Sequence, residues 1–174
     1  MSNGELASVP TIPAASDQYV LTLLVCDRGS ALERILGVLR RRGPSFSTVN
    51  VATSEERQMA RITISLQGTR QAADQAIEHL RKIVDVRWAT VVPASGANEG
   101  PLLREFALVR VACDAQTRRE VMALAQTFAA RVVDVADSSL TLEASGPSDT
   151  IEQFVHLLRP IGIRDLARTG RLAI

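Results

Sequence analysis

The chain has 174 residues, enough for one large domain or two small ones. Apolar residues make up 46% of it and charged residues 22%, which is the composition of an ordinary soluble globular protein. The formal net charge of +1 gives no electrostatic reason to expect a nucleic-acid or membrane-surface partner. Cys26 and Cys113 stand far apart and form no CxxC pair, so we expect reduced thiols in a cytoplasmic protein rather than a disulfide framework or a zinc site.

Regular patterning begins at Tyr19. Residues 1–18 have neither a basic start nor an apolar run, so they do not resemble a signal peptide, and their small residues and two prolines predict a disordered tail. The next predicted elements, in chain order, are a strand at 19–26, a helix that ends at Gly43, strands at 46–53 and 59–66, a helix at about 70–82 and a strand at 84–92. Apolar and polar residues alternate along 59–66, which predicts a half-buried strand.

The same order of elements follows a linker. Residues 93–101 contain two prolines, two glycines and small polar residues, so we place a linker at 94–103 between domains at 19–93 and 104–174. The predicted elements of the second domain are a strand at 104–113, a helix capped by Asp114 that runs to about 129, a hairpin around 136–138, a helix at 148–159 capped by Ser148, and a strand at 161–168.

Both domains therefore follow the order βαββαβ, which makes a four-stranded antiparallel sheet with both helices on one face. We predict an α+β protein of two tandem ferredoxin-like domains. The other face of each small sheet is left open, and a partner commonly covers such a face, so we expect an oligomer.

No catalytic or metal-binding constellation is present in the sequence. His79 and His156 each fall in a predicted amphipathic helix without a Cys, Asp or Glu partner at ligand spacing, so we interpret both as helix-flank residues. No GxSxG, HExxH or glycine-rich phosphate loop occurs. We interpret Glu55, Glu56 and Asp85 as solvated charges.

Nucleic-acid binding finds no support either. RNA-recognition modules share the βαββαβ order but stack bases on strand aromatics, and 58–66 contains none. The run Arg40–Arg42 is explained by cations at a helix C-terminus. No helix-turn-helix or basic face suggests a transcriptional regulator.

The turn Asp27–Ser30, at the N-terminus of the first predicted helix, allows two interpretations. It is an ordinary strand-to-helix connection, or it is a cradle for a small anionic ligand, because the first helical N–H groups have no intrahelical partner and face the positive end of the helix dipole.

From about Tyr19 to its end, the chain resembles the small, regulatory subunit of acetolactate synthase. The stretches that carry the resemblance are Ala31-Leu32, Arg34, Gly37, Leu39 and Arg42-Gly43 around the first helix, RITI at 61–64, LRKIVDV at 80–86, RVVDVADSSLTLEASG at 131–146 and LLRPIGIRDLARTG at 157–170.

The resemblance implies that the first domain is an ACT domain, a small-molecule-sensing module, and that this chain is not itself an enzyme and carries no cofactor. It implies a homodimer through the ACT domains and a large catalytic subunit that carries thiamine diphosphate, Mg²⁺ and FAD. That enzyme makes acetolactate at the start of branched-chain amino-acid biosynthesis. The small subunit activates it and in most members confers inhibition by valine.

The resemblance also places an effector where two ACT domains meet, against the strand-to-helix turn and the start of the second strand. The implied effector-binding residues are Asp27, Arg28, Gly29, Ser30, Ala31, Leu32 and Ser45. The family pattern Asn-x-x-Gly-x-Leu, with a later Asn, keeps only its Leu here: Asp27, Ser30 and Ser45 replace the two Asn residues and the Gly.

These replacements change the chemistry of the turn. An ionised Asp27 accepts hydrogen bonds but cannot donate one to a carboxylate, Ser30 adds a Cβ, and Ser45 is shorter than Asn. We therefore expect valine feedback to be weak or altered while activation persists. Two alternatives stay open: Arg28 supplies the carboxylate contact, or Gly29 replaces the missing glycine. A competing function is a stand-alone ACT-type amino-acid sensor that controls another enzyme.

Overall fold

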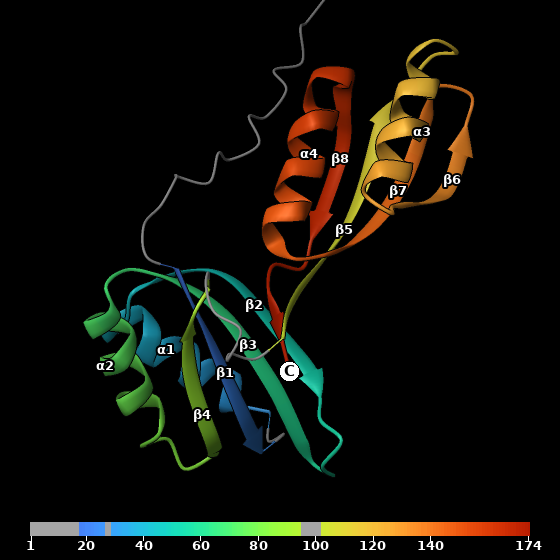
Figure 1. The fold of residues 1–174 in the computed structure, drawn as a ribbon. Coiled ribbons are helices and arrows are strands. Elements are labelled where there is room, and N and C mark those ends of the chain that lie inside the picture. The colour runs from blue at the N-terminus through green and yellow to red at the C-terminus, as the bar shows by residue number, and fades with distance from the viewer. Residues whose placement is uncertain (1–17, 27–28, 95–101) are drawn as a thin grey trace, which may run out of the picture.

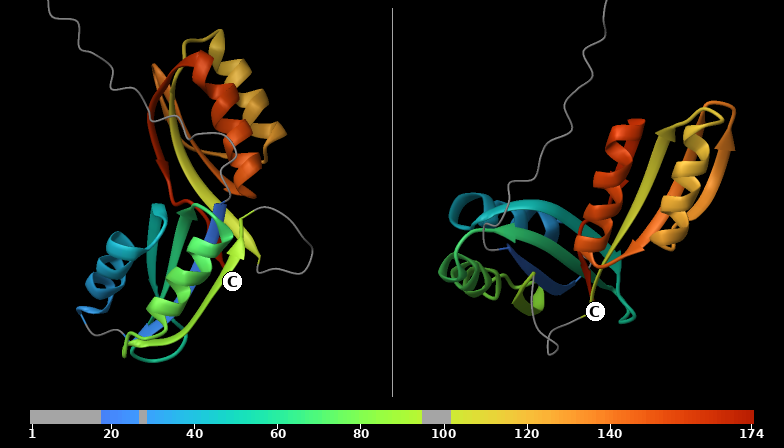
Figure 2. Two further views of the ribbon diagram at one scale, coloured as in Figure 1. Left: turned by 90° about the vertical axis from the view of Figure 1, so that its left-hand side faces the viewer. Right: turned by 45° about the horizontal axis from the view of Figure 1, so that its top comes forward.

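A computed structural model of the chain describes residues 18–26, 29–94 and 102–174. The first domain consists of β1 (Gln18–Cys26), α1 (Ala31–Arg42), β2 (Ser45–Thr53), β3 (Met59–Gln67), α2 (Arg70–Leu80) and β4 (Val86–Pro93). Its strands form an antiparallel sheet in the order β2-β3-β1-β4. Both helices lie on one face of this sheet, as Figures 1 and 2 show.

The second domain repeats this topology. It consists of β5 (Leu103–Ala112), α3 (Thr117–Thr127), β6 (Arg131–Ala136), β7 (Ser139–Gly146), α4 (Ser148–Gly162) and β8 (Ile163–Arg168). The strand order is β6-β7-β5-β8, and the two-residue strand β9 (Leu172–Ala173) pairs with the start of β5. The predicted α+β class with two βαββαβ units is confirmed.

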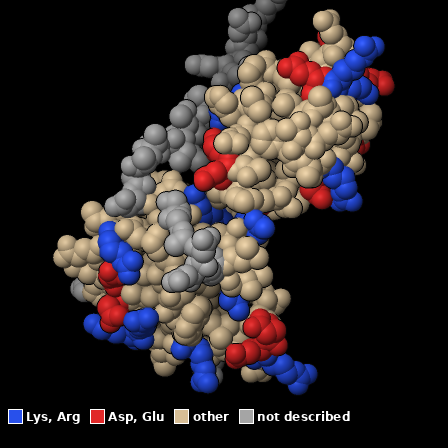
Figure 3. Space-filling view, in the orientation of Figure 1, with Lys and Arg blue, Asp and Glu red and all other residues tan. Residues whose placement is uncertain are grey.

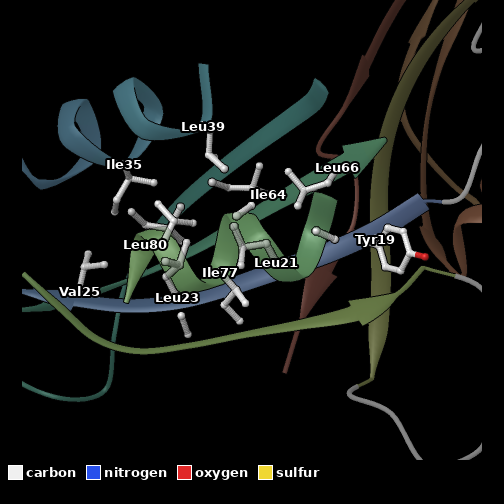
Figure 4. Packing of buried hydrophobic residues seen from close by; sticks show 14 of the residues in the cluster. Tyr19, Leu21, Leu23, Val25, Ile35, Leu39, Ile64, Leu66, Ile77 and Leu80 are labelled. Carbon is white, nitrogen blue, oxygen red and sulfur yellow. The ribbon is translucent and has the colours of Figure 1, made fainter. Parts of the chain in front are cut away.

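Each domain has its own aliphatic core between sheet and helices. In the first domain, β1 and β3 face α1 and α2 through Leu21, Leu23, Val25, Ile64, Ile35, Leu39, Ile77 and Leu80 (Figure 4). In the second, Phe154 of α4 is fully buried, and its ring centroid lies 5.3 Å from that of Phe128. Burial of one such side chain contributes about 1.5–3 kcal/mol, so these residues fix the helices on their sheets.

The end of α1 requires a glycine. The Gly43 N–H donates to the Leu39 carbonyl oxygen at 2.8 Å, which closes the last turn. A Cβ on Gly43 would lie only 2.8 Å from that oxygen and 3.0 Å from the Leu39 Cα. The backbone of Gly43 is extended, so close approach and not a left-handed conformation is the reason for glycine here.

Of the two predicted helix caps in the second domain, only one is formed. Asp114 Oδ1 accepts the N–H groups of Gln116 and Thr117 at 2.9 and 2.8 Å, while the Thr117 hydroxyl accepts the Asp114 N–H at 3.0 Å. This reciprocal pair caps α3 as predicted for Asp114. The Ser148 prediction is wrong: α4 begins at Ser148 itself, and its hydroxyl donates to Glu105 Oε2 at 2.8 Å.

Strand β3 is buried on both faces along most of its length, so the prediction of a half-buried strand at 59–66 is wrong. Thr63 and Ser65 of β3 are 3% and 5% exposed. The Thr48 hydroxyl of the edge strand β2 donates to Ser65 Oγ at 2.8 Å. The C-terminal segment crosses β2 at this point, because Gly170 lies directly against Thr48.

Charged side chains are dispersed over the surface shown in Figure 3, where small groups of both signs mark both domains. Within the described part of the chain, no helix combines the length and the apolar character that crossing a membrane would need.

Candidate effector site

The strand-to-helix turn lies between the end of β1 at Cys26 and the start of α1 at Ala31. Of the implied effector-binding residues, Asp27 and Arg28 lie outside the described residues. Gly29 and Ser30 are exposed. The Ser30 carbonyl oxygen accepts the Arg34 N–H at 3.2 Å, which opens the helix, whereas the Ser30 hydroxyl makes no capping hydrogen bond. The first turn of α1 therefore leaves its N–H groups uncapped by this side chain.

Ala31 and Leu32 have a different environment. Ala31 is 4% exposed and belongs to the core of the first domain, and Leu32 is half-buried against the same core. Both residues hold the start of α1 on the sheet. Their contribution to an effector site is to fix the position of the turn.

Ser45 lies at the opposite end of the sheet. It pairs with Gln67, which pairs with Gln18 at the start of β1, whereas the turn follows Cys26 at the other end of that strand. Gln18 and Cys26 are about 26 Å apart at about 3.3 Å per residue. One chain therefore does not bring Ser45 to its own turn, and a site that uses both needs a second copy.

Asp85 is a residue of this site that the sequence analysis missed. Its expected solvated state is wrong: it is 4% exposed, and its carboxylate forms an ion pair with Arg34 of α1. Its carbonyl oxygen accepts the Cys26 N–H at 2.9 Å. Asp85 is buried because it directly precedes β4 and returns alongside the end of β1, where its two groups hold both ends of the turn.

Arg34 joins this arrangement from the first part of α1. Its side chain is 49% exposed, and Asp85 pairs with one terminal nitrogen only. Among the residues that the structure describes, its other N–H groups have no hydrogen-bond partner. Sequence signals existed for both residues, since Arg34 and Asp85 fall within stretches that carry the family resemblance, but charge alone gave no reason to pair them.

Glu55, Glu56 and the two histidines that the sequence analysis singled out belong to no metal site in the described part of the chain. Glu55 and Glu56 are exposed, in agreement with their interpretation as solvated charges. His156 is exposed, whereas His79 is half-buried, with a buried Nδ1 that has no hydrogen-bond partner. Within the described residues, no group of three or more His, Cys, Asp or Glu side chains is placed to hold a metal ion.

Comparison with known proteins decides the family. Residues 104–174 match the family described as "Small subunit of acetolactate synthase", and residues 27–88 match an ACT domain. The chain is 32% identical over 157 residues to the probable acetolactate synthase small subunit of Archaeoglobus fulgidus, an alignment that covers 90% of this chain and 96% of that protein. The chain belongs to the acetolactate synthase small-subunit family.

Other relatives agree with this assignment. The acetolactate synthase small subunit of Bacillus subtilis is 33% identical over 156 residues, which covers 88% of each chain. The crystal structure of the small subunit from Thermotoga maritima matches this fold with a TM-score of 0.79 at 26% identity, over 90% of this chain and 96% of that one. The family predicted from the sequence, including its ACT domain, is confirmed.

Proposed function

We propose that this protein is the non-catalytic regulatory subunit that activates a thiamine-diphosphate-dependent acetolactate synthase in branched-chain amino-acid biosynthesis. The observation that carries the proposal is the nearly full-length match to proteins named as acetolactate synthase small subunits, which includes the family-specific segment at 104–174 and the ACT domain. The partner of the proposal is the large, catalytic subunit.

The effector site of the proposal is shared between two copies of the chain. Its support is the distance along β1: Ser45 and the turn occupy opposite ends of one sheet, so Ser45 of one copy must approach the turn of the other. The first N–H groups of α1, together with the Arg34 N–H groups that have no partner among the described residues, suit the carboxylate of a small amino acid.

We further propose that valine inhibits the holoenzyme weakly or in an altered way, while the chain still activates the catalytic subunit. An anionic Asp27 attracts the ammonium group of an amino acid and repels its carboxylate. Ser30 is exposed at the turn with its hydroxyl uncommitted to a cap, and its Cβ stands where a glycine would leave the backbone bare. By contrast, Ala31 and Leu32, which position the turn, pack on the core of the first domain.

The test is acetolactate formation by the cognate catalytic subunit, with and without this protein, across a valine titration. We expect activation without strong valine inhibition. Activation with full valine inhibition would keep the assignment and contradict the interpretation of Asp27, Ser30 and Ser45. An absence of both activation and co-purification would favour the stand-alone sensor instead.

A gain-of-function variant tests whether these three positions set the response to valine. The triple substitution Asp27→Asn, Ser30→Gly and Ser45→Asn restores the family pattern, and we expect it to make the holoenzyme more sensitive to valine. The matched control is Ser47→Ala, because Ser47 is exposed on the same strand as Ser45. A triple variant that responds to valine like the wild-type protein would show that these positions do not set the response.

A further inference from the structure

The segment that follows β8 contacts the first domain across a large sequence separation. Asn50 Nδ2 of β2 donates to the Thr169 carbonyl oxygen at 2.8 Å, and Arg171 Nη1 donates to Gln18 Oε1 at 2.7 Å. In Figure 1 the C-terminus lies between the two domains, where this segment passes β2. Two polar contacts thus join the C-terminal domain to the strands at both sides of the ACT sheet's β3.

Gly170 lies between these contacts and leaves no room for a side chain. Its φ is +71°, and a Cβ would lie 2.5 Å from Thr48 Oγ1 and 2.6 Å from Thr48 Cγ2. Thr48 is itself held by the hydrogen bond that its hydroxyl donates to Ser65. The close approach of this segment to β2 therefore requires glycine for two independent reasons.

The same segment is anchored in the C-terminal domain. Thr169 and Phe106 form two hydrogen bonds. The Thr169 N–H donates to the Phe106 carbonyl oxygen at 3.0 Å, and the Phe106 N–H donates to the Thr169 hydroxyl at 3.1 Å. Arg168 Nε donates to Glu105 Oε1 at 2.6 Å, and its Nη1 donates to Glu152 Oε2 at 2.5 Å. Glu105 is 3% exposed, so the pair Arg168–Glu105 is buried, whereas Glu152 lies at the surface.

We propose that residues 168–171 form a latch that couples β2 of the ACT domain to the C-terminal sheet, so that a displacement at the start of β2 reaches the C-terminal domain. The latch bears on Thr48 and Asn50, which closely follow the candidate effector residue Ser45. The pairing of β2 with β3 shifts register between Phe46 and Thr48. This irregularity therefore lies between Ser45 and the residues that the latch contacts.

The latch has a regulatory meaning that rests on the proposed function. The sensor module matches residues 27–88, and the segment specific to acetolactate synthase matches 104–174. A signal that passes from one to the other travels through the connecting chain or through contacts such as the latch. The latch is the route that starts on β2.

The first experiment needs only the full-length protein. Hydrogen exchange followed by mass spectrometry compares the wild type with Gly170→Ala and with a matched control, Gly146→Ala, whose added Cβ would lie 3.9 Å from its nearest neighbour, Thr150. We expect Gly170→Ala to speed exchange about tenfold both in 169–174 and in β2, and Gly146→Ala to do neither. Faster exchange confined to 169–174, or none, would overturn the coupling.

A milder variant keeps the test decisive if Gly170→Ala does not fold. Asn50→Ala removes one hydrogen bond on β2, and Ser47→Ala on the same strand is its control. We expect Asn50→Ala to speed exchange in 169–174, more than 100 residues away in the chain. Equal exchange in the Asn50 and Ser47 variants would contradict the latch.

The second experiment adds the catalytic subunit. With the Gly170→Ala protein we expect activation to fall about twofold or more, and with Gly146→Ala to stay at the wild-type level. Full activation by a Gly170→Ala protein with faster exchange would overturn the regulatory role. If the wild-type protein does not activate at all, the proposed function fails, and the exchange experiment still decides whether the latch couples the domains.

Discussion

Asp85 and Arg34 form an ion pair whose two ends have different surroundings, and this asymmetry has consequences for stability. The Asp85 side chain is 5% exposed, whereas that of Arg34 is 49% exposed. Removal of Arg34 leaves a buried carboxylate without its partner, while removal of the carboxylate charge leaves an arginine that water can reach. The cost of the two substitutions should therefore differ.

We expect Arg34→Leu to lower the free energy of unfolding of the first domain by about 2–3 kcal/mol and Asp85→Asn by only about 1 kcal/mol. Urea unfolding followed by tryptophan fluorescence measures both, because Trp88 in β4 is the only tryptophan of the chain. The same loss for the two variants would indicate that water reaches Asp85 after all.

Asp114 predicts a pH dependence at the start of α3. Hydrogen bonds from the Thr117 N–H, the Thr117 hydroxyl and the Gln116 N–H lower the pKa of Asp114 below its ordinary value of 3.8. Its stabilising effect is therefore complete above pH 3.8 and is lost as the pH falls through the lower pKa of the folded state.

At pH 7, Asp114→Ala should lower the melting temperature by about 2–4 °C in calorimetry, because the cap is lost. Asp114→Asn is the control, since Asn caps about as well without a titrating group. The wild-type protein should lose stability relative to Asp114→Asn below about pH 4. A constant difference between them down to pH 3 would contradict the capping role of the carboxylate.

At the residue scale, contacts between neighbours in the sequence could be predicted, but contacts with distant residues could not. Asp114 stands immediately before an amphipathic pattern, so its cap could be found in the sequence. Asp85 falls at the start of the strand predicted at 84–92, but its ion-pair partner Arg34 is 51 residues away in the chain. Ser148 has the residue type and position of a cap, yet the buried Glu105 captures its hydroxyl.

Gly37 lies inside helix α1 and Gly43 directly follows it, and substitution of the two by alanine should have opposite effects. A Cβ on Gly37 meets only Arg41 Nη2, at 3.7 Å, whereas one on Gly43 meets the Leu39 backbone at 2.8 Å. Gly37→Ala should stabilise the first domain by about 0.5–1 kcal/mol, because glycine in a helix interior is unfavourable. Gly43→Ala should destabilise it by about 1–3 kcal/mol. Urea titration with Trp88 fluorescence measures both, and two changes of one sign would contradict the contacts at Gly43.

Periodicity located the helices and strands of the two βαββαβ units, most clearly in α2 and α4, each of which buries one regular face. It could not fix the end of α4, which continues through Pro160 to Gly162 although proline usually marks a helix end, and Ile161 of this last turn packs against the core. It also missed β9, because two residues are too few to show alternation. The buried second face of β3 was not predictable for a related reason: the segment 169–171, a distant part of the chain, lies against its neighbour β2.

At the scale of the whole molecule, a site that uses both the turn and Ser45 needs a second copy. Cross-linking tests this directly: Gly29→Cys and Ser45→Cys chains, each in a Cys26→Ser background, are mixed and treated with a short thiol-specific reagent. Both positions are exposed. We expect a cross-linked dimer mainly in the mixture, because the two positions are too far apart within one chain.

Each chain treated alone is the control for that experiment, and the buried Cys113 is common to all samples. A mixture that yields no more dimer than either chain alone would show that the turn and Ser45 do not meet across copies. The sequence could name the residues of such a site through the family resemblance. It could not show that one sheet separates them, because that separation exists only in the strand register.

The order of synthesis gives the latch a further consequence. The strands and helices of the ACT domain contact one another within the first 93 residues, so this domain can fold before the second one exists. The latch residues 168–171 follow all four helices in the chain, whereas their partners Gln18, Thr48 and Asn50 precede most of it. At about 5–20 residues per second, the ribosome needs roughly 4–15 s to make the second domain. For that time a newly made ACT domain exists with β2 uncovered by the proposed latch, and the latch can join the two domains only when synthesis of the second is almost finished.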